Sequence, residues 1–359
     1  MTKINVKLKN NPYSIIIEKN LKNKLSALIK EYNLGNLGFV ITSPQVFKLY
    51  KKEIKKNFGN NKYKIIVTAD GEKAKSRHWL FKIIKEILKD DQTSKKPFLI
   101  CLGGGTIGDL GGFAASVYKR GIPCIQIPTT LIGQIDSSIG GKTAIDLPEA
   151  KNILGSFYQP KAVLIDPTFL KTLTKKDLKE GLAEAIKYGL IKDKDLFYLI
   201  KDNPKKIMNL DLSLINKIIY KSAKIKAKIV EEDEKEKKGV RTILNFGHTF
   251  AHGLEAACRY KNISHGKAVA IGMLYAAHLS QQLGKCSKKE IEEIKAILKL
   301  YNLPTKIQFN PKELLKAISY DKKFTTGKIR MVLIQRIAQV EVSDKITPQN
   351  LKKSFKKIN

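Results

Sequence analysis

The segment FLICLGGGTIGDLGGFAAS, residues 98–116, gives the strongest indication of the fold. It opens with an apolar run that predicts a buried strand, and it ends in residues that favour a helix. Between them, Gly103, Gly105 and Gly108 follow the spacing G-x-G-x-x-G, which lets backbone amides at a helix N-terminus receive a pyrophosphate. This order predicts a nucleotide-binding unit, and a tight turn without a ligand is the alternative.

The strand that follows this unit departs from the ordinary Rossmann pattern. It ends in IPTT, residues 127–130, where a dinucleotide-binding unit usually places an acidic residue that binds the ribose. Any dinucleotide must therefore be held through other contacts.

Further apolar runs extend the strand pattern on both sides of the glycine-rich segment. Residues 38–42, 64–68, 124–128 and 162–166 read as buried strands, with helical periodicity between several of them. This alternation predicts a parallel sheet covered by helices.

Beyond residue 174 the strand signal nearly vanishes, and a short strand is expected again only at 329–335. The periodicity is helical in four stretches, residues 204–231, 242–258, 266–283 and 287–301. We therefore expect a Rossmann-like α/β domain over residues 1–174 and a mostly helical domain over residues 175–359, with an active site in the cleft between them.

The composition is that of an ordinary globular protein, with 43% hydrophobic and 28% charged residues. No apolar run reaches the roughly 18 residues that span a bilayer, and the N-terminal residues lack the apolar core of a signal peptide. The scattered cysteines form no CxxC pair and predict reduced thiols in a cytoplasmic protein. They are Cys101, Cys124, Cys258 and Cys286.

The net charge of +34 invites a nucleic-acid interpretation. However, the lysines are spread along the whole chain, stand beside acidic residues in amphipathic stretches, and lack interleaved aromatic residues. Solvated faces explain most of this charge, so nucleic-acid binding is not expected. A positive field could still steer an anionic substrate.

The segment SSIGGKTAID, residues 137–146, ends like a phosphate-binding P-loop. The first glycine of that motif would fall at position 136, which is Asp136, so we reject the P-loop. The glycines still expose Lys142 at a loop where a phosphate could approach. Lys151 follows closely, and a surface lysine is its alternative interpretation.

The segment KEGLAEAIKYGLI, residues 179–191, places Glu180, Glu184 and Lys187 on one face of a predicted helix. Such a trio is usually a set of surface ion pairs. Apolar neighbours around Glu184 favour a buried face instead, and a buried carboxylate needs a cation or a metal.

The segment RTILNFGHTFAHGLEA, residues 241–256, spaces Arg241, Asn245, His248 and His252 at four, three and four residues. This spacing predicts one polar stripe on one helix, which a site explains better than a structural role. His265 precedes another apolar helix. With Glu184 and His248 it would form the two-histidine, one-carboxylate set of a catalytic zinc site, which is one guess among several.

Six segments in order from about residue 98 to 275 resemble the 3-dehydroquinate synthase family. They are GGGTIGDLGGFAAS, YKRGIPCIQIPTTLIGQIDSSIGGKTAID, KNILGSFYQP, EGLAEAIKYGLI, RTILNFGHTFAHGLEA and HGKAVAIGM. The resemblance implies the dehydroquinate synthase-like fold, bound NAD, one divalent metal, zinc or else cobalt, and a cytoplasmic homodimer.

The implied reaction belongs to the shikimate pathway and is that of a carbon–oxygen lyase. It converts 3-deoxy-D-arabino-heptulosonate 7-phosphate to 3-dehydroquinate and phosphate through transient oxidation by NAD, elimination of phosphate, re-reduction and intramolecular aldol closure. Net oxidation is zero, because NAD is restored in each turnover.

The resemblance also assigns site residues by position. The metal ligands are Glu184, His248 and His265, and the catalytic residues are Glu236, His252 and Lys142. The substrate contacts are Arg120, which reaches the site of a neighbouring subunit, Asp136, Lys142, Asn152, Lys187, Lys226, Arg241, Asn245 and His252. The cofactor contacts are Asp70, Gly71, Glu72, Lys75, Gly103, Gly104, Gly105, Gly108, Asp109, Thr129, Thr130, Asp136, Lys142, Lys151, Phe169, Leu170, Lys171 and Thr172.

Two stretches depart from the family pattern. The first nucleotide-contact loop usually holds an Asp and an Asn, but here it offers Ser43 and Gln45, which leaves the adenosine contacts open. The stretch between Glu236 and Arg241 is one residue longer than usual, which leaves the alignment of Glu236 and Lys226 open. One basic residue within 321–330 is expected to contact phosphate, and the sequence does not indicate which one.

Three other functions give different expectations. A glycerol-dehydrogenase-like enzyme would keep the glycine turn and the metal set but not the anion-binding set of Lys142, Lys151, Asn152 and Arg241. Another sugar phosphate cyclase would not need Arg241 with Lys226, which are assigned to a substrate carboxylate. A basic nucleic-acid-binding protein offers no role for Glu184 or His265.

Overall fold

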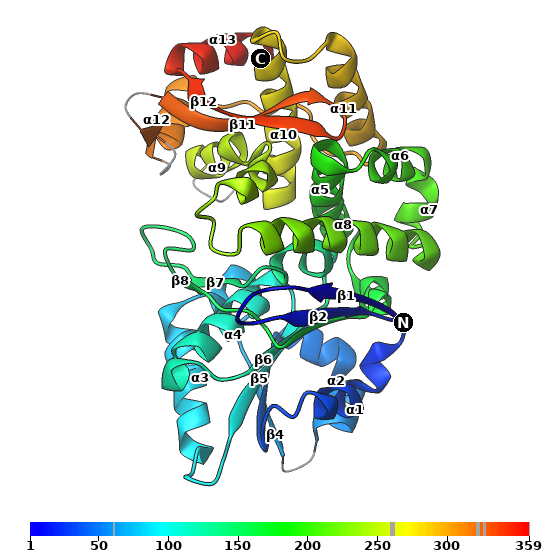
Figure 1. Cartoon of the computed structure of the whole chain (residues 1–359), viewed down its shortest axis with the longest axis vertical. Helices are drawn as coiled ribbons and strands as arrows, with labels where there is room; N and C mark the ends of the chain where they lie inside the picture. Colours follow the sequence, from blue (N-terminus) through cyan, green and yellow to red (C-terminus); the bar gives the residue numbers. More distant parts are fainter. Residues whose placement is uncertain (60–61, 259–262, 321–323, 326–327, 359) are drawn as a thin grey trace. The chain divides into compact units, whose positions relative to one another are not determined.

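The computed structural model of the chain describes residues 1–59, 62–258, 263–320, 324–325 and 328–358 (Figure 1). The chain forms two compact units, Met1–Thr174 with Ile215–Lys235, and Lys175–Leu214 with Glu236–Asn359. Helix α8 (Leu212–Glu232) therefore belongs mostly to the first unit. The division at residue 174 and the placement of the site between two domains remain predictions. Among the described helices, none is long and apolar enough to cross a membrane.

A seven-stranded sheet forms the centre of the first unit, in the order β1-β2-β9-β6-β5-β3-β4. All neighbouring strands are parallel except β1 and β2, which form an antiparallel hairpin at one edge. The strands are β1 (Thr2–Val6), β2 (Tyr13–Ile17), β3 (Leu37–Thr42), β4 (Tyr63–Val67), β5 (Pro97–Gly103), β6 (Cys124–Pro128) and β9 (Ala162–Ile165). The predicted parallel sheet is confirmed, and each of the five predicted strands is present.

Helices cover both faces of this sheet. Alternate residues of β3 point to opposite faces, so Val40 packs with α1 (Leu25–Glu31) and α2 (Pro44–Phe58), whereas Phe39 and Ile41 pack on the other face. The helices of that second face are α3 (Arg77–Asp90) and α4 (Gly105–Val117). Burial on both faces explains why the strands are continuous apolar runs rather than alternating patterns.

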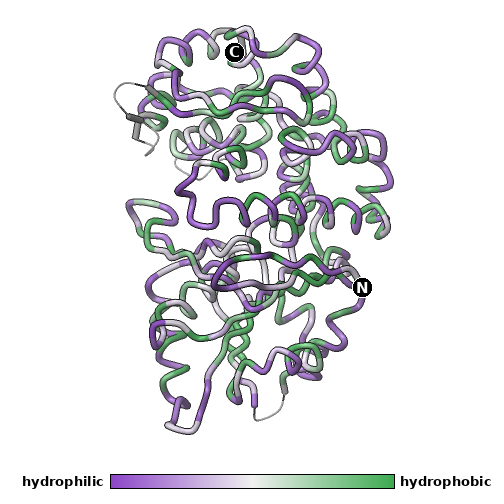
Figure 2. Tube along the Cα trace, in the orientation of Figure 1, coloured by the Kyte–Doolittle hydropathy of each residue, from purple (hydrophilic) through white to green (hydrophobic). Residues whose placement is uncertain are grey.

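The second unit is mostly helical and contains a small antiparallel sheet. Its helices are α5 (Lys175–Lys192), α6 (Lys194–Asp202), α7 (Pro204–Met208), α9 (His248–Ala257), α10 (His265–Gln282), α11 (Lys288–Leu300), α12 (Pro311–Tyr320) and α13 (Pro348–Ile358). Its strands are β10 (Phe324–Thr325), β11 (Lys328–Arg336) and β12 (Gln339–Ile346). The strand predicted at 329–335 lies within β11. Figure 2 shows hydrophobic and hydrophilic residues alternating along many helices, as expected where one side is buried.

Two predicted helices are interrupted. The helix expected at 204–231 is divided into α7 and α8, with Leu210 between them in the left-handed region at φ 56°. The prediction of one continuous helix over 242–258 is wrong. Its first part is a 3₁₀ helix, Val240–Asn245, and α9 begins only after Gly247, whose φ is 81°.

The break at Gly247 follows from the close packing of α9 against α10. A methyl group added at Gly272 in α10 would lie 2.2 Å from the carbonyl oxygen of Gly247. A methyl group added at Gly247 would lie 2.7 Å from the backbone nitrogen of Met273. Two glycines therefore let the backbone before His248 touch the middle of α10.

We expect Gly272→Ala to lower the free energy of unfolding by about 1–3 kcal/mol, because the added methyl group must push α9 and α10 apart. Denaturant unfolding of the purified protein measures this loss. Gly284→Ala is the control, since an added methyl group there meets nothing within 4 Å and only the positive φ is penalised. A smaller loss for Gly272→Ala than for Gly284→Ala would contradict the packing argument.

Candidate active site

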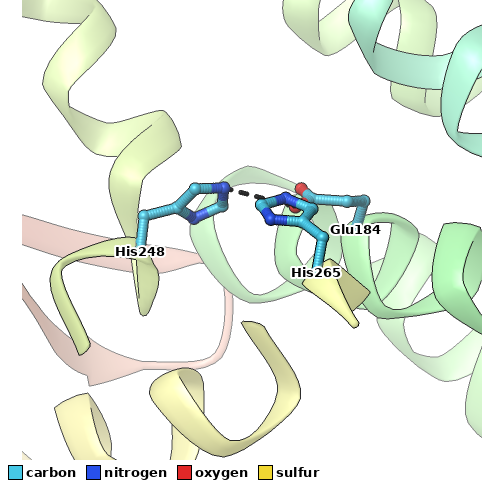
Figure 3. Close-up of side chains that lie close together, drawn as sticks. All are labelled: Glu184, His248 and His265. Atoms are coloured by element: carbon cyan, nitrogen blue, oxygen red, sulfur yellow. Dashed lines mark ion pairs between the residues drawn. The ribbon is translucent and has the colours of Figure 1, made fainter. Parts of the chain in front are cut away.

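Three side chains from separate helices converge in the second unit (Figure 3). Glu184 lies on α5, while His248 and His265 are the first residues of α9 and α10. Their potential ligand atoms all lie within 4.8 Å of one another. Oε1 of Glu184 is 3.3 Å from Nε2 of His248 and 3.3 Å from Nε2 of His265. Within the described parts of the chain, this is the group of His, Cys, Asp and Glu side chains that could hold a metal.

The carboxylate of Glu184 is fully buried, and neither of its oxygens makes a hydrogen bond of normal geometry. The ammonium group of Lys187, itself 2% exposed, lies 2.5 Å from Oε2. Burial alone would raise the pKa of Glu184, but Lys187 and His248 hold it well below its usual value. The site therefore contains a buried anion with unused acceptor capacity, which is what a cation requires.

In each imidazole ring, the nitrogen that points away from Glu184, Nδ1, lies next to an oxygen acceptor. Nδ1 of His248 lies 3.3 Å from the carbonyl oxygen of Phe246, and Nδ1 of His265 lies 3.2 Å from Oε1 of Glu255. A carbonyl or carboxylate oxygen can only accept, so each Nδ1 carries a hydrogen and each Nε2 faces Glu184. This arrangement presents two imidazole nitrogens and one carboxylate oxygen to a common point.

The protonation states of these side chains depend on whether a cation occupies the point that the three of them face. Burial lowers the pKa of His248, and Lys187 lowers it further. Burial also acts to lower the pKa of His265, but its contacts with Glu184 and Glu255 raise it to about 10. A proton on His265 therefore balances the carboxylates unless another cation takes its place.

His252 lies beside the cluster and remains exposed. Its ring centroid is 5.5 Å from that of His248 and 6.4 Å from that of His265. Arg241 is 2% exposed and lies in the 3₁₀ helix, with Nε 3.4 Å from Oε1 of Glu236. The expected stripe on one helix is therefore wrong, because Arg241 and Asn245 precede Gly247 and only the histidines belong to α9.

The glycine-rich turn of the first unit has the expected form. Strand β5 ends at Gly103, and α4 begins at Gly105. The backbone N–H of Thr129 donates to the carbonyl of Gly103 at 2.9 Å, and a methyl group added at Gly104 would lie 3.2 Å from the side chain of Thr130. The turn and the end of β6 are thus neighbours.

Several predicted contacts of the first unit form one polar network. The ammonium group of Lys75, 5% exposed, lies 2.6 Å from Oδ2 of Asp109 and also donates to Oδ1 of Asn152. Burial raises the pKa of Asp109 to about 6, although Lys75 acts to lower it. Close by, Thr106 donates to Oε1 of Glu72 at 3.1 Å. A buried lysine therefore ties the glycine-bearing helix α4 to the loop that carries Asn152.

A second pair in the same unit joins Asp136 to Lys226. Lys226 projects from α8 and donates to Oδ1 of Asp136 at 2.6 Å and to its carbonyl oxygen at 2.7 Å. Asp136 lies in a π-helical turn, Gly133–Ser137, a local irregularity that often marks functional sites. Lys142 is the exposed first residue of β7 (Lys142–Ile145), which pairs with β8 (Leu154–Phe157).

The other predicted contacts are buried in the core, cap a helix or lie on the surface. Phe169 and Leu170 are buried in the core, so only their backbone could meet a ligand. Ser43 accepts from the backbone N–H of Val46 and caps α2. The remaining exposed predicted contacts, besides those already described, are Asp70, Gly71, Arg120, Lys151, Lys171 and Thr172. Of the predicted phosphate-contact segment, residues 321–323 and 326–327 lie outside the described residues.

Sequence reasoning missed Glu255 and gave Glu180 no role of its own. Glu255 lies seven residues after His248, two turns along α9, and contacts His265. Glu180 lies one turn before Glu184 and binds the first turn of α10. The available signal was an acidic residue on an otherwise apolar helix face, which indicates a buried partner.

Known proteins resemble the chain along nearly its whole length. The family models for the N-terminal and C-terminal parts of 3-dehydroquinate synthase match residues 65–180 and 181–324. A 3-dehydroquinate synthase of Clostridium botulinum is 46% identical over 342 residues, covering 94% of this chain and 97% of that protein. One of Dictyoglomus turgidum is 41% identical over 357 residues, covering 99% and 98%.

Solved structures share the architecture. A 2-epi-5-epi-valiolone synthase from Streptomyces hygroscopicus, with NAD+ and Zn2+ bound, gives a TM-score of 0.87 at 25% identity and covers 98% of both chains. A sulfoacetaldehyde reductase from Bifidobacterium kashiwanohense gives 0.70 at 14% identity over 97% of both chains, which shows the fold alone. The family models and the near-full-length relatives show that the chain belongs to the 3-dehydroquinate synthase family.

Proposed function

We propose that this chain is a 3-dehydroquinate synthase of the shikimate pathway. It would convert 3-deoxy-D-arabino-heptulosonate 7-phosphate to 3-dehydroquinate and phosphate, with NAD and one divalent metal, zinc or cobalt. The observation that carries the proposal is the convergence of Glu184, His248 and His265 in a member of this family. In the solved relative, the same architecture holds NAD+ and Zn2+.

The residues of the cluster fit a divalent metal. The buried carboxylate of Glu184 has acceptor capacity to spare, and the Nε2 atoms of His248 and His265 face it. Three protein ligands leave a further coordination position for substrate oxygen. When bound, the metal would supply a Lewis acid and NAD a hydride acceptor that is restored in each turnover.

The side chains around the cluster would bind and orient the substrate. Arg241 has the planar geometry that grips a carboxylate, and burial keeps its guanidinium in place. His252 is exposed beside the metal ligands, where it can move a proton on the substrate, and Glu236 shares that task. Asn245 and Lys187 contribute a hydrogen-bond donor and a positive charge.

The first unit would bind the cofactor and the anionic ends of the substrate. The amides at the start of α4 receive the pyrophosphate of NAD, and Thr129 and Thr130 lie next to that turn. Lys142 and Asn152 bind the phosphate end of the substrate. Lys226, held by Asp136, binds the carboxylate with Arg241. An enzyme that takes a hydride from a neutral alcohol would have no use for these cations.

We also propose a cytoplasmic homodimer in which Arg120 reaches the neighbouring site. All four cysteines are unpaired, in keeping with a reducing compartment. Two apolar side chains close to Arg120 are exposed, Val117 to 43% and Phe157 to 41%. The hydroxyl of Ser156 donates to that of Ser116, and this hydrogen bond joins β8 to the end of α4. Exposed apolar side chains beside a functional arginine support a protein–protein surface.

The reaction itself gives the first test. Zinc-loaded protein incubated with the heptulosonate phosphate and a trace of NAD is expected to release phosphate over many turnovers. Absorbance at the NADH wavelength should stay at its starting level, because each hydride taken is returned. Conversion of the trace of NAD to NADH, with substrate loss that stops at the amount of NAD supplied, would instead indicate a net dehydrogenase.

The metal ligands give the second test. We expect His248→Ala to lower bound zinc well below one equivalent per chain, because the site loses one of its three ligands. Metal analysis after gel filtration measures this. His278→Ala is the matched control, as it removes a partly buried histidine of α10 that lies outside the cluster. Full zinc occupancy in His248→Ala would remove His248 from the ligand set.

The dimer gives the third test. We expect Phe157→Glu to convert the dimer to a monomer, because it places a charge on the proposed contact surface. Light scattering after gel filtration gives the mass. Leu300→Glu, at a position 45% exposed at the end of α11, is the control and should leave the mass unchanged. A dimer that persists in Phe157→Glu would move the contact surface elsewhere.

A further inference from the structure

Two carboxylates outside the proposed metal ligands converge on His265. Glu255, on α9, is 7% exposed and lies 3.2 Å from Nδ1 of the imidazole. Glu180, on α5, accepts from the hydroxyl of Ser264 and from the backbone N–H of Gly266, the residues on either side of His265. Neither residue belongs to the proposed set of three metal ligands, so their contacts with His265 and its neighbours indicate a different role.

Glu180 acts as the N-terminal cap of α10. Its Oε2 accepts from the backbone N–H of Gly266 at 2.6 Å, and its Oε1 accepts from the hydroxyl of Ser264. Ser264 occupies the capping position but makes no cap hydrogen bond with its own side chain. A carboxylate from another helix therefore replaces the usual cap, in a position that the helix dipole favours.

The capping contact fixes the spacing between two ligands. Glu180 and Glu184 lie one turn apart on α5, so the helix that carries one ligand holds the first turn of the helix that carries another. A methyl group added at Gly266 would lie 2.6 Å from Cα of Glu180. The two helices thus touch at His265, with little freedom to slide.

Glu255 fixes the ring rather than the backbone. Because a carboxylate only accepts, its contact holds the hydrogen on Nδ1 of His265 and leaves Nε2 directed at Glu184, 3.3 Å away. Glu255 lies two turns after His248 on α9. The helix that supplies one histidine ligand therefore orients the other, and such outer partners raise the basicity of the ligand they hold.

We propose that Glu180 and Glu255 are positioning residues for His265 that set how tightly this chain holds its divalent metal. Glu255 sets the orientation and tautomer of the ring, and Glu180 sets the place of the backbone from which the ring projects. This inference rests on the metal site of the proposed function. Loss of such an outer partner typically weakens metal binding by about 10–100-fold.

Zinc affinity, measured by competition with a chromophoric chelator, tests the proposal without any use of catalytic activity. Glu255→Ala should raise the zinc dissociation constant by about 10–100-fold. Glu255→Gln should fall between it and the unmodified protein, because an amide oxygen can still accept from Nδ1. Glu180→Ala should weaken zinc binding and alter the visible absorption of the Co2+-loaded protein, since the ligand geometry changes.

Glu290→Ala is the matched control for Glu180→Ala. Glu290 caps α11 together with Ser287, so its removal costs a comparable helix cap at a place away from the metal ligands. It should lower the melting temperature and leave the zinc dissociation constant and the Co2+ spectrum unchanged. Should Glu255→Ala or Glu180→Ala not fold, the glutamine variants carry the comparison.

The outcomes separate this proposal from the one on which it rests. Zinc affinity and Co2+ spectra that match the unmodified protein in Glu255→Ala and Glu180→Ala overturn the positioning role, while the metal site stands if His248→Ala loses zinc. Failure of the unmodified protein to bind zinc overturns both. An equal loss of affinity in Glu290→Ala would reduce the effect to general stability and also overturn the proposal.

Discussion

The buried carboxylate of Glu184 is the constraint on which the second unit depends. It has no solvent exposure and no hydrogen bond of normal geometry, yet its pKa is held well below the usual value. A charge in this position must be balanced by cations, and the chain supplies Lys187 on one side and two imidazoles on the other. A divalent metal between the three ligands would satisfy the same requirement with shorter and stronger contacts.

The helices around Glu184 are arranged to meet that requirement. Helix α9 can begin at His248 only because Gly247 adopts a left-handed conformation against α10. Helix α10 begins at His265, where Glu180 caps it. Each of the three helices thus carries one proposed ligand, and α5 and α9 also hold the helix or ring of another. Geometry of this kind positions the ligands before any ion arrives, which lowers the cost of binding.

Much of the fold and of the candidate site could be predicted from the sequence, wherever the local pattern and the chemistry agree. The strands are continuous apolar runs because both faces of the sheet are buried, and the glycine spacing marks the turn before α4. The break at Gly247 could not be predicted, because helical periodicity continues through a glycine whose φ depends on a contact with Gly272. The hairpin of β1 and β2 was missed, since β1 is a mostly exposed edge strand. Glu255 was missed because its partner, His265, lies on another helix.

X-ray absorption at the zinc edge of the zinc-loaded protein identifies the atoms that bind the metal. We predict nitrogen and oxygen neighbours at about 2.0–2.2 Å, with the outer-shell scattering of two imidazole rings, as expected for two histidines and one carboxylate. A sulfur neighbour at about 2.3 Å, or a first shell without imidazole scattering, would contradict it. Either result would mean that the buried charge of Glu184 is balanced by Lys187 and a protonated histidine alone.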